Sequence, residues 1–355
     1  MIISIIIGAR PNFIKLAPLI KEIEKNKKFT YRLIHTGQHY DYKMSQIFFK
    51  DLKLPKPNYN LGIGSGSHSY QTGKVMIELE KFFLKEKPDI VVVLGDVNST
   101  LAGALVSAKL DIPVAHIEAG VRSFNKKMPE EINRILTDHI SSFLFCPTET
   151  AVYNLKKEGI AKGVYKVGDI MYDVFKLKIK DQKSKILQKL KLKPKTYLLL
   201  TLHRPQNVDN IDKLKNILSA INETGEKIVF PIHPRTKKML HQLPVKNYQL
   251  SNINIIEPVG YSDMLILEKN AKKILTDSGG IQKESYWCKV PCITLREETE
   301  WPETVQSGWN ILVGSNKKKI INAIISFSPS SNYKKIFGNG NASKKIIKVL
   351  ESVYK

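Results

Sequence analysis

The chain has 355 residues, which is longer than a single hydrophobic core usually serves, and its 42% of hydrophobic residues can fill two cores, so two globular domains are expected. Its 56 Lys and Arg residues outnumber 33 Asp and Glu residues, and the net charge of +23 would suit a nucleic acid or another phosphate-bearing partner. Much of that excess is lysine on predicted helix surfaces, and no apolar run approaches the roughly 20 residues that cross a bilayer, so neither a nucleic acid nor a membrane is expected as a partner.

Short apolar segments rich in β-formers alternate with amphipathic helical patterns in the first half of the chain. Strands are predicted at residues 2–7, 30–36, 89–94 and 113–117, and helices from Pro11, at 67–87, at 98–110 and from Pro129. That alternation is typical of parallel sheets with helices on both faces.

The alternation of strand and helix patterns is interrupted over residues 168–194, a mostly helical and lysine-rich stretch, and then resumes. Further strands are predicted at 197–202, 227–230, 253–256, 273–275 and 291–295. We therefore expect an α/β fold of two Rossmann-like domains whose parallel sheets face a central cleft, where ligands bind. The predicted domains are residues 1–170, residues 171–338, and a last helix at 339–355 that packs back on the first domain.

The first strand-to-helix junction, IIIGARPNFIKLAPL, has the composition of an anion site. Gly8 permits a tight exit from the strand, Pro11 suits the start of a helix, and Arg10 and Lys15 supply positive charge near the turn. A surface ion pair of Arg10 is the alternative interpretation.

Two carboxylates follow neighbouring predicted strands and should reach the same sheet edge. Asp96 follows one strand and Glu118 follows the next. Asp96 could instead cap the helix after it. Glu118 lies between a buried strand and Gly120, so its carboxylate needs a partner.

A third carboxylate, Glu131, lies in the first turn of the helix that MPEEINR begins, where it could simply favour the helix dipole. Together with Asp96 and Glu118 it would form a cluster able to move protons on a substrate.

In the second half, basic and imidazole side chains follow two strands. TLHRP places His203 after one strand, and PIHPR places His233 and Arg235 after the next. They suggest an anionic ligand, although histidines at strand ends also serve in packing.

The segment ILTDSGGIQKE predicts a diphosphate site. Gly279 and Gly280 would let a phosphate approach the amides at a helix start, with the Ser278 hydroxyl beside them. Glu284, further along that helix, could accept hydrogen bonds from a ribose diol. A plain Asp-Ser-Gly turn is the alternative.

These segments resemble the non-hydrolysing UDP-N-acetylglucosamine 2-epimerases of the glycosyltransferase-B superfamily. The resemblance runs through nearly the whole chain in family order, over GARPNFIKLAPL, TGQHYD, LGDVNSTLAGA, HIEAGVRS, PEEINR, TLHRPQN, HPRT, EPVGYSDM, TDSGGIQKE and TEWPE.

The resemblance implies two groups of site residues. Asp96, Glu118 and Glu131 match the catalytic carboxylates, and His203 matches both a catalytic position and the UDP site. The matched positions that hold the UDP-sugar are Arg10, Lys15, Val259, Met264, Ser278, Gly279, Gly280, Glu284 and Trp301.

One loop departs from the family pattern. Where many bacterial members read TERPE, with an arginine on the nucleotide, this chain has Trp301, and Arg296 is the candidate to replace that arginine. Val259 likewise replaces a polar residue of some relatives.

The activity that the resemblance implies is C2 epimerisation of UDP-N-acetylglucosamine, without a redox cofactor or metal, by a homodimer. A glycosyltransferase of the same fold would share the sugar-nucleotide site but would not need three carboxylates in the first half. A hydrolysing epimerase would release UDP and free sugar, and a basic nucleic-acid-binding protein would bind with steep salt dependence.

Cysteine usage and the N-terminus indicate the compartment. Cys146, Cys288 and Cys292 are too few and too isolated for a metal site and are expected to be reduced thiols. The N-terminus has no signal-peptide pattern, so we expect a cytoplasmic protein.

Overall fold

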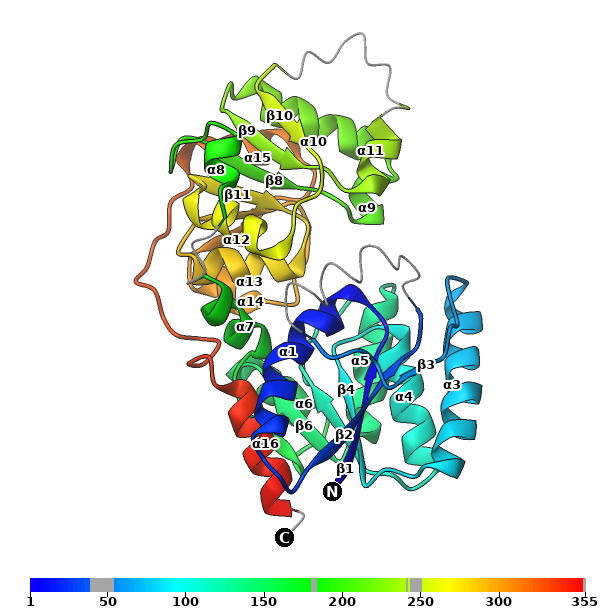
Figure 1. The fold of residues 1–355 in the computed structure, drawn as a ribbon. Helices are drawn as coiled ribbons and strands as arrows, with labels where there is room; N and C mark the ends of the chain where they lie inside the picture. Colours follow the sequence, from blue (N-terminus) through cyan, green and yellow to red (C-terminus); the bar gives the residue numbers. More distant parts are fainter. Residues whose placement is uncertain (39–53, 180–183, 241, 243–250, 354–355) are drawn as a thin grey trace. The chain divides into compact units, whose positions relative to one another are not determined.

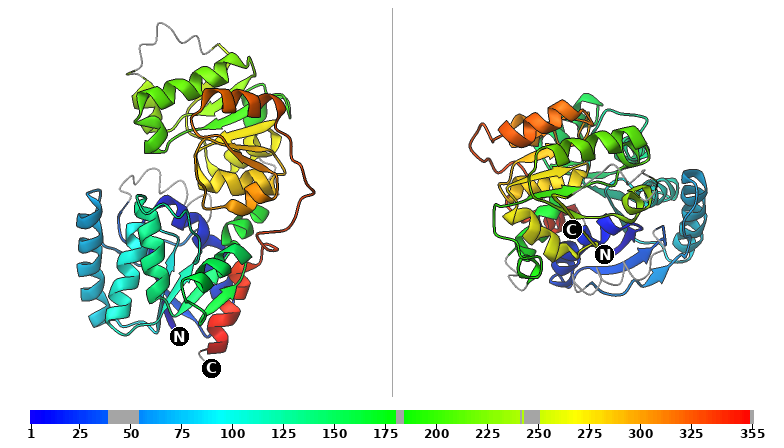
Figure 2. Two further views of the ribbon diagram at one scale, coloured as in Figure 1. Left: turned by 180° about the vertical axis from the view of Figure 1, so that it is seen from behind. Right: turned by 90° about the horizontal axis from the view of Figure 1, so that it is seen from above.

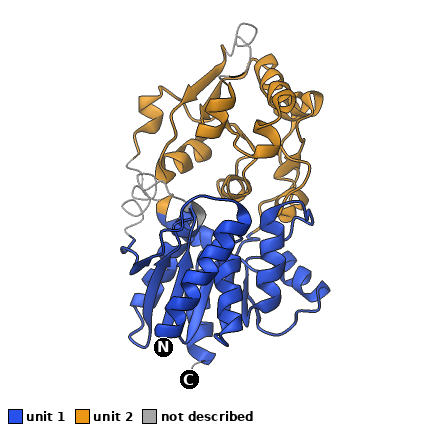
Figure 3. Cartoon of the chain, turned by 90° about the vertical axis from the view of Figure 1, so that its right-hand side faces the viewer, with its two compact units in different colours: residues 1–177, 335–355 blue, residues 178–334 orange. Residues whose placement is uncertain are grey.

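The computed structural model describes residues 1–38, 54–179, 184–240, 242 and 251–353, with only the backbone of Arg10 and Pro11 (Figure 1). The chain forms two compact units, Met1–Leu177 with Lys335–Lys355 (unit 1) and Lys178–Lys334 (unit 2) (Figure 3). Each unit is built on its own sheet, and every strand pair in both sheets is parallel. The predicted α/β class with two parallel-sheet domains is therefore confirmed.

Unit 1 has a seven-stranded sheet in the order β3-β2-β1-β4-β5-β6-β7. Its described elements are β1 (Ile2–Ile7), α1 (Arg10–Glu24), β2 (Thr30–His35), β3 (Tyr59–Asn60), α3 (His68–Lys85), β4 (Ile90–Leu94), α4 (Asn98–Lys109), β5 (Val114–Ile117), α5 (Pro129–Ile140), β6 (Phe143–Cys146), α6 (Glu149–Lys157), β7 (Val164–Lys166), α7 (Ile170–Lys178) and α16 (Ala342–Val353).

Side chains alternate between the two faces of this sheet, as the two-residue period of a strand requires. On β1, Ile3, Ile5 and Ile7 face α1 and α16, whereas Ile6 faces the side covered by α3 and α4. Figure 2 shows helices on both faces of the sheet. Because both faces are covered, the strands are nearly continuous apolar runs, which is the pattern that made them predictable.

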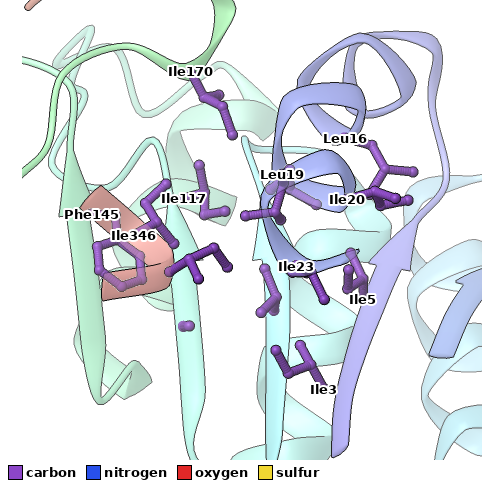
Figure 4. Close-up of a cluster of buried hydrophobic side chains, with 14 of the residues drawn as sticks. Ile3, Ile5, Leu16, Leu19, Ile20, Ile23, Ile117, Phe145, Ile170 and Ile346 are labelled. Atoms are coloured by element: carbon purple, nitrogen blue, oxygen red, sulfur yellow. The ribbon is translucent and has the colours of Figure 1, made fainter. Parts of the chain in front are cut away.

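Helix α16 completes the core of unit 1 although it comes from the far end of the chain. Ile346 lies among Leu19, Ile117 and Phe145 (Figure 4). The helix start is fixed by Asp173 of α7, which accepts hydrogen bonds from the N–H groups of Ala342 at 3.0 Å and Ser343 at 2.8 Å.

Unit 2 has a six-stranded sheet in the order β10-β9-β8-β11-β12-β13. Its described elements are α8 (Ile186–Lys189), β8 (Leu198–Thr201), α9 (Pro205–Val208), α10 (Ile211–Glu223), β9 (Ile228–Pro231), α11 (Pro234–Leu240), β10 (Ile253–Ile256), α12 (Tyr261–Asn270), β11 (Lys273–Thr276), α13 (Gly279–Trp287), β12 (Cys292–Thr294), α14 (Pro302–Gln306), β13 (Asn310–Leu312) and α15 (Lys317–Ser326).

The core of unit 2 has the same two-sided construction. Leu198, Leu200 and Leu202 belong to the cluster with α10 and α15, whereas Leu199 belongs to the cluster with α8 and α12. In the described parts of the chain no helix has the length and apolar character that crossing a membrane requires.

Both sheets have a topological switch point, between β1 and β4 in unit 1 and between β8 and β11 in unit 2. In open α/β sheets, ligands bind outside the carboxyl ends of the strands at such a point, because the connections there diverge to opposite faces. The segments that start at Gly8 and Gly95 leave the first switch point, and those that start at Leu202 and Asp277 leave the second.

The predicted strands and helices agree with the structure to within two residues at the ends that the sequence analysis gave, except that the last helix begins at Ala342, three residues later than predicted. Four short strands were missed, β3, β6, β7 and β13, each of two to four residues. Runs of two or three residues, as in β3, β7 and β13, carry too few alternations to show a period. The stretch predicted as mostly helical contains α7 and α8, with residues 180–183 outside the described part.

Candidate functional site

A buried ion pair lies at the carboxyl edge of the unit 1 sheet. Lys15, from the second turn of α1, contacts Oε2 of Glu118, which follows β5, and their side chains are only 8% and 12% exposed. Gly95 lies directly beneath, because a Cβ there would come within 2.8 Å of Lys15 Nζ. Two residues that the sequence nominated separately are therefore in contact.

Glu118 has a left-handed backbone conformation, with φ of +78°. A non-glycine residue held in such a region costs on the order of 1–3 kcal/mol and persists only when its surroundings fix it. Here the N–H groups of Glu118 and Ala119 both donate to the carbonyl of Phe145, at 3.1 and 3.2 Å. Strained backbone conformations of this kind are common at functional sites, and here the conformation places the Glu118 carboxylate beside Lys15.

Asp96 follows β4 and is bound by Arg134 of α5. Arg134 donates to Asp96 Oδ2 from Nε at 3.0 Å and from Nη2 at 2.6 Å. The interpretation of Asp96 as a helix cap is wrong, because Val97 is the N-cap of α4 and makes no side-chain cap bond. The Asp96 side chain is 31% exposed, so a ligand can reach it.

Glu131 is a fixed and fully buried carboxylate. It accepts hydrogen bonds from the N–H of Ser123 at 2.9 Å, the Ser123 hydroxyl at 3.0 Å and the N–H of Phe124 at 2.8 Å. Arg134 adds a fourth bond at 2.7 Å and so joins Glu131 to Asp96. The three predicted carboxylates thus lie at one edge of unit 1, but proton transfer by Glu131 itself would require these bonds to open.

At the switch point of unit 2, the buried carboxylate of Asp277 orients His203. Oδ1 of Asp277 is 3.0 Å from His203 Nδ1, and Oδ2 accepts hydrogen bonds from the N–H groups of His203 and Arg204 at 2.9 and 2.8 Å. Burial alone would raise the pKa of Asp277, but the hydrogen bonds and charge of His203 and the Arg204 N–H outweigh it and lower this pKa. An ionised Asp277 needs a donor, so His203 Nδ1 carries a proton and the ring is fixed.

The glycine pair at the start of α13 serves two purposes. A Cβ on Gly280 would meet nothing nearer than the Ser278 hydroxyl at 3.8 Å, so the backbone there is open to a ligand. A Cβ on Gly279 would lie 3.3 Å from both Glu300 Oε2 and Trp301 Nε1, so this glycine allows close packing of the 300–301 segment. Ser278 is the N-cap of α13 and makes no side-chain cap bond to its own helix. An open helix start of this kind suits an anion.

Glu284 lies inside unit 2, 5% exposed, beside a second carboxyl group. Burial, and then the neighbouring Glu284, raise the pKa of Glu268 well above its ordinary range. The same causes, in that order, raise the pKa of Tyr261. Burial and the neighbouring carboxylate therefore both favour the protonated form of Glu268.

The loop that departs from the family pattern is tightly held. Arg296 binds both oxygens of Glu300, from Nη1 at 2.8 Å and from Nη2 at 3.1 Å. Trp301 is 5% exposed, and Lys283 Nζ lies 3.9 Å from the centroid of its ring. Arg296 is therefore bound within this loop, and Lys283 is a second cation beside Trp301 that the sequence analysis did not nominate.

The remaining candidates divide between the surface and a hydrophobic cluster. His233 and Arg235 are exposed after β9, where the Arg235 N–H donates to His233 Nδ1 at 3.2 Å, and the His233 ring centroid is 5.6 Å from that of His203. Val259 and Met264 are partly buried in the cluster of α8, α12 and the strands they cover. Arg10 begins α1, and its side chain lies outside the described part.

Several residues that organise the site were missed by the sequence analysis. Arg134 had a signal, because it lies three residues after Glu131 on a predicted helix and so on the same helix face. Lys283, Glu268 and Asp138 had none, because their roles depend on contacts between elements far apart in the chain.

The described residues contain no group of three His, Cys, Asp or Glu side chains arranged to hold a metal ion. What they do contain is one set of carboxylates with a buried lysine in unit 1, and one helix start flanked by His203 in unit 2. The first set can move protons, and the second can hold an anion.

Comparison with known proteins identifies the family. Residues 21–351 match the family model described as UDP-N-acetylglucosamine 2-epimerase. A Methanococcus maripaludis protein named UDP-N-acetylglucosamine 2-epimerase homolog is 57% identical, over 99% of this chain and 100% of that protein. The UDP-2,3-diacetamido-2,3-dideoxy-D-glucuronate 2-epimerase of Pseudomonas aeruginosa is 44% identical, over 99% of each chain.

A solved structure agrees in fold as well as in sequence. The crystal structure of Methanocaldococcus jannaschii UDP-GlcNAc 2-epimerase, in complex with UDP-GlcNAc and UDP, matches with a TM-score of 0.90 and 52% identity, over 99% of this chain and 100% of that one. The chain therefore belongs to the UDP-N-acetylglucosamine 2-epimerase family and is an isomerase of the epimerase type.

Proposed function

We propose that the protein converts UDP-N-acetylglucosamine reversibly to UDP-N-acetylmannosamine by inverting C2, and that it needs no metal or redox cofactor. The observation that supports the proposal is that the switch points of the two sheets have different functional groups beside them. Carboxylates with a buried lysine lie at the first, and an open helix start beside a fixed histidine lies at the second. Proton transfer and diphosphate binding are what this epimerisation requires.

The C2 proton is not adjacent to a carbonyl, so its direct removal would leave a poorly stabilised carbanion. In the proposed route a base takes the C2 proton, the C2–H electron pair forms a C1=C2 bond, and the C1–O bond breaks with its electrons on UDP. The product pair is 2-acetamidoglucal and UDP. UDP then adds back at C1, and a proton is delivered to the opposite face of C2.

Unit 1 supplies the proton chemistry in this proposal. Asp96 is the accessible carboxylate, and Glu118 is held by Lys15, whose positive charge favours the ionised form. Glu131 is fully hydrogen-bonded through Arg134, which supports a role in holding Asp96 in place.

Unit 2 supplies the nucleotide site in this proposal. The amides at the start of α13 and His203 stabilise the diphosphate as it departs, with Ser278, Gly279 and Gly280 beside it. Glu284 is proposed for the ribose, and Val259, Met264 and Trp301 for the nucleotide.

Incubation with UDP-N-acetylglucosamine in deuterated water, followed by NMR of the sugar, tests substrate and route together. We expect deuterium at C2 and formation of UDP-N-acetylmannosamine. Epimerisation without deuterium would overturn the elimination route. Free sugar would identify a hydrolysing epimerase, and transfer to an acceptor would identify a glycosyltransferase.

The carboxylate roles are tested by Asp96→Asn, Glu118→Gln and Glu131→Gln. Each should lower turnover strongly while UDP binding, measured by calorimetry, stays largely intact, because the helix start and the histidine proposed for the diphosphate belong to unit 2. Glu149→Gln is the matched control, since this unit 1 glutamate is 75% exposed. Near-normal turnover in all three variants would contradict the proposal.

A second substrate candidate is a UDP-2,3-diacetamido-2,3-dideoxyglucuronate. The observation that favours it is the 44% identity to an epimerase named for that substrate. Measuring kcat/KM for both nucleotide sugars decides between them, and a tenfold preference for the uronate would replace N-acetylglucosamine as the substrate. We further propose a cytoplasmic homodimer, on the family resemblance, to be tested by cell fractionation and light scattering.

A further inference from the structure

Unit 1 also contains a chain of four charged side chains that the proposed mechanism does not use; three of them are buried, and the fourth, Glu158, is 25% exposed. His116, on β5, places Nδ1 2.7 Å from Oδ1 of Asp138, on α5. Asp138 Oδ2 is 2.7 Å from Arg122 Nη1, and Arg122 binds both carboxylate oxygens of Glu158, at 2.8 and 2.7 Å. The His116 and Asp138 side chains have no solvent exposure, and Arg122 has almost none.

The other ring nitrogen of His116 also faces an acceptor. Nε2 lies 2.8 Å from the carbonyl oxygen of Gly95, which can only accept a hydrogen bond. On the Asp138 side, burial would raise the pKa of the carboxyl, but the charge and hydrogen bond of His116, with Arg122, outweigh it and lower this pKa. The Arg122 guanidinium, 2.7 Å from Oδ2, and the Gly120 N–H, which donates to Oδ2 at 3.0 Å, independently favour the ionised form, so Asp138 also accepts a hydrogen bond from His116.

Two acceptors require two donors, so both ring nitrogens must carry a proton. A neutral imidazole would turn a lone pair toward the Gly95 carbonyl or toward Asp138, in a region where no water replaces the lost bond. As an imidazolium, His116 instead continues an alternating series of charges through Asp138 and Arg122 to Glu158. The four charges cancel, which allows their burial.

This group joins the three segments that carry the proposed catalytic carboxylates. Gly95 precedes Asp96, and its N–H also donates to the carbonyl of Ile117, at 3.0 Å. His116 is two residues before Glu118 on β5, and Asp138 is one helical turn after Arg134 on α5. Asp138 also accepts the N–H of Gly120 at 3.0 Å, which fixes the chain after Glu118.

We propose that His116 is a positioning residue, a buried imidazolium whose Nε2–H holds the Gly95 carbonyl and so fixes Asp96 and the Lys15–Glu118 pair relative to one another. It touches no substrate. The inference rests on the proposed function for its effect on turnover, whereas the protonation of His116 stands independently of any activity.

The activity test compares His116→Gln with wild type. Glutamine can donate to only one of the two acceptors, so the Gly95 segment loses its fixed position. We expect kcat to fall by about tenfold to a hundredfold, the loss that a displacement of about 1 Å can cause in an active site. KM and UDP affinity should stay within about twofold, because the helix start and the histidine proposed for the diphosphate belong to unit 2.

His139→Gln is the matched control, because His139 is on the same helix as Asp138 but is 46% exposed. Its turnover should equal that of wild type. Unchanged kcat in His116→Gln, or equal losses in both variants, would overturn the positioning role. If the wild type itself proves inactive on every nucleotide sugar tried, the proposed function fails and the second measurement still decides the protonation of His116.

That second measurement is NMR of the wild-type protein labelled with ¹⁵N-histidine, in which His116→Gln serves only to assign the signal. At pH 7 one histidine should show hydrogens on both ring nitrogens, protected from solvent exchange, and its signals should be absent from His116→Gln. A neutral His116, with a hydrogen on one ring nitrogen only, would overturn the inference.

Discussion

Replacing Glu268 with glutamine should make the stability of unit 2 less dependent on pH. The pKa of this carboxyl is raised well above its ordinary value of 4.5, first by burial and then by Glu284. The folded chain therefore keeps a proton that the unfolded chain loses above about pH 4.5. A group whose pKa is raised on folding contributes its full stabilisation of the folded state at pH values below its unfolded pKa. That contribution is lost as the pH rises toward its folded pKa.

The magnitude follows from one proton. While only the unfolded chain is ionised, the free energy of unfolding falls by about 1.4 kcal/mol per pH unit on account of Glu268. An amide does not titrate, has nearly the shape of the protonated acid, and can donate to Glu284. While the folded carboxyl stays protonated, the stability of Glu268→Gln should therefore rise relative to wild type with increasing pH, by up to about 1.4 kcal/mol per pH unit.

The assay can follow unit 2 alone, because all three tryptophans, Trp287, Trp301 and Trp309, lie within it. Urea unfolding at pH 6, 6.75 and 7.5, followed by tryptophan fluorescence, gives the free energy at each pH. Glu257→Gln is the control, since its side chain is 76% exposed, and its difference from wild type should not vary with pH. A constant difference for Glu268→Gln would refute the raised pKa of Glu268.

Three other predictions concern the framework. Arg134→Met should destabilise unit 1 by about 2–3 kcal/mol in calorimetry, less than a fully buried pair because one of its two carboxylates is 31% exposed. Gly120→Ala should cost about 2–5 kcal/mol by the same method, because φ is +77° and the new Cβ would lie 2.3 Å from the Ala151 carbonyl oxygen. Asp277→Asn should destabilise unit 2 more at pH 7 than at pH 3. A carboxyl whose pKa is lowered on folding contributes its full stabilisation above its ordinary pKa of 3.8, and that contribution declines as the pH falls toward the folded pKa. Tryptophan fluorescence measures this, and an equal loss at both pH values would contradict it.

The fold could be predicted from the sequence because burial on both faces leaves a local trace. Strands such as β4 and β8 are unbroken apolar runs between turn residues, and the helices between them have a clear period. Strands such as β3, with two residues, leave no such trace.

The site could be predicted in part, for a different reason. Asp96 and Glu118 were found because each follows a recognisable strand, and parallel strands end at one edge of the sheet. What they bind could not be predicted, because Arg134 reaches Asp96 across 38 residues and Lys15 reaches Glu118 across 103. The burial of Glu131 and its four hydrogen bonds likewise depend on the turn at Ser123, which has no local signal.

Helix α16 has a consequence for how the chain is made. Its residues Ala342, Ile346 and Leu350 belong to the same core as β1 and α1, yet they follow all of unit 2 in the chain. A ribosome therefore synthesises all of the continuous unit 2 before it makes the helix that covers an apolar face of unit 1. During synthesis the unit with the carboxylates should be the last to become native, and until then it is the part most in need of a chaperone.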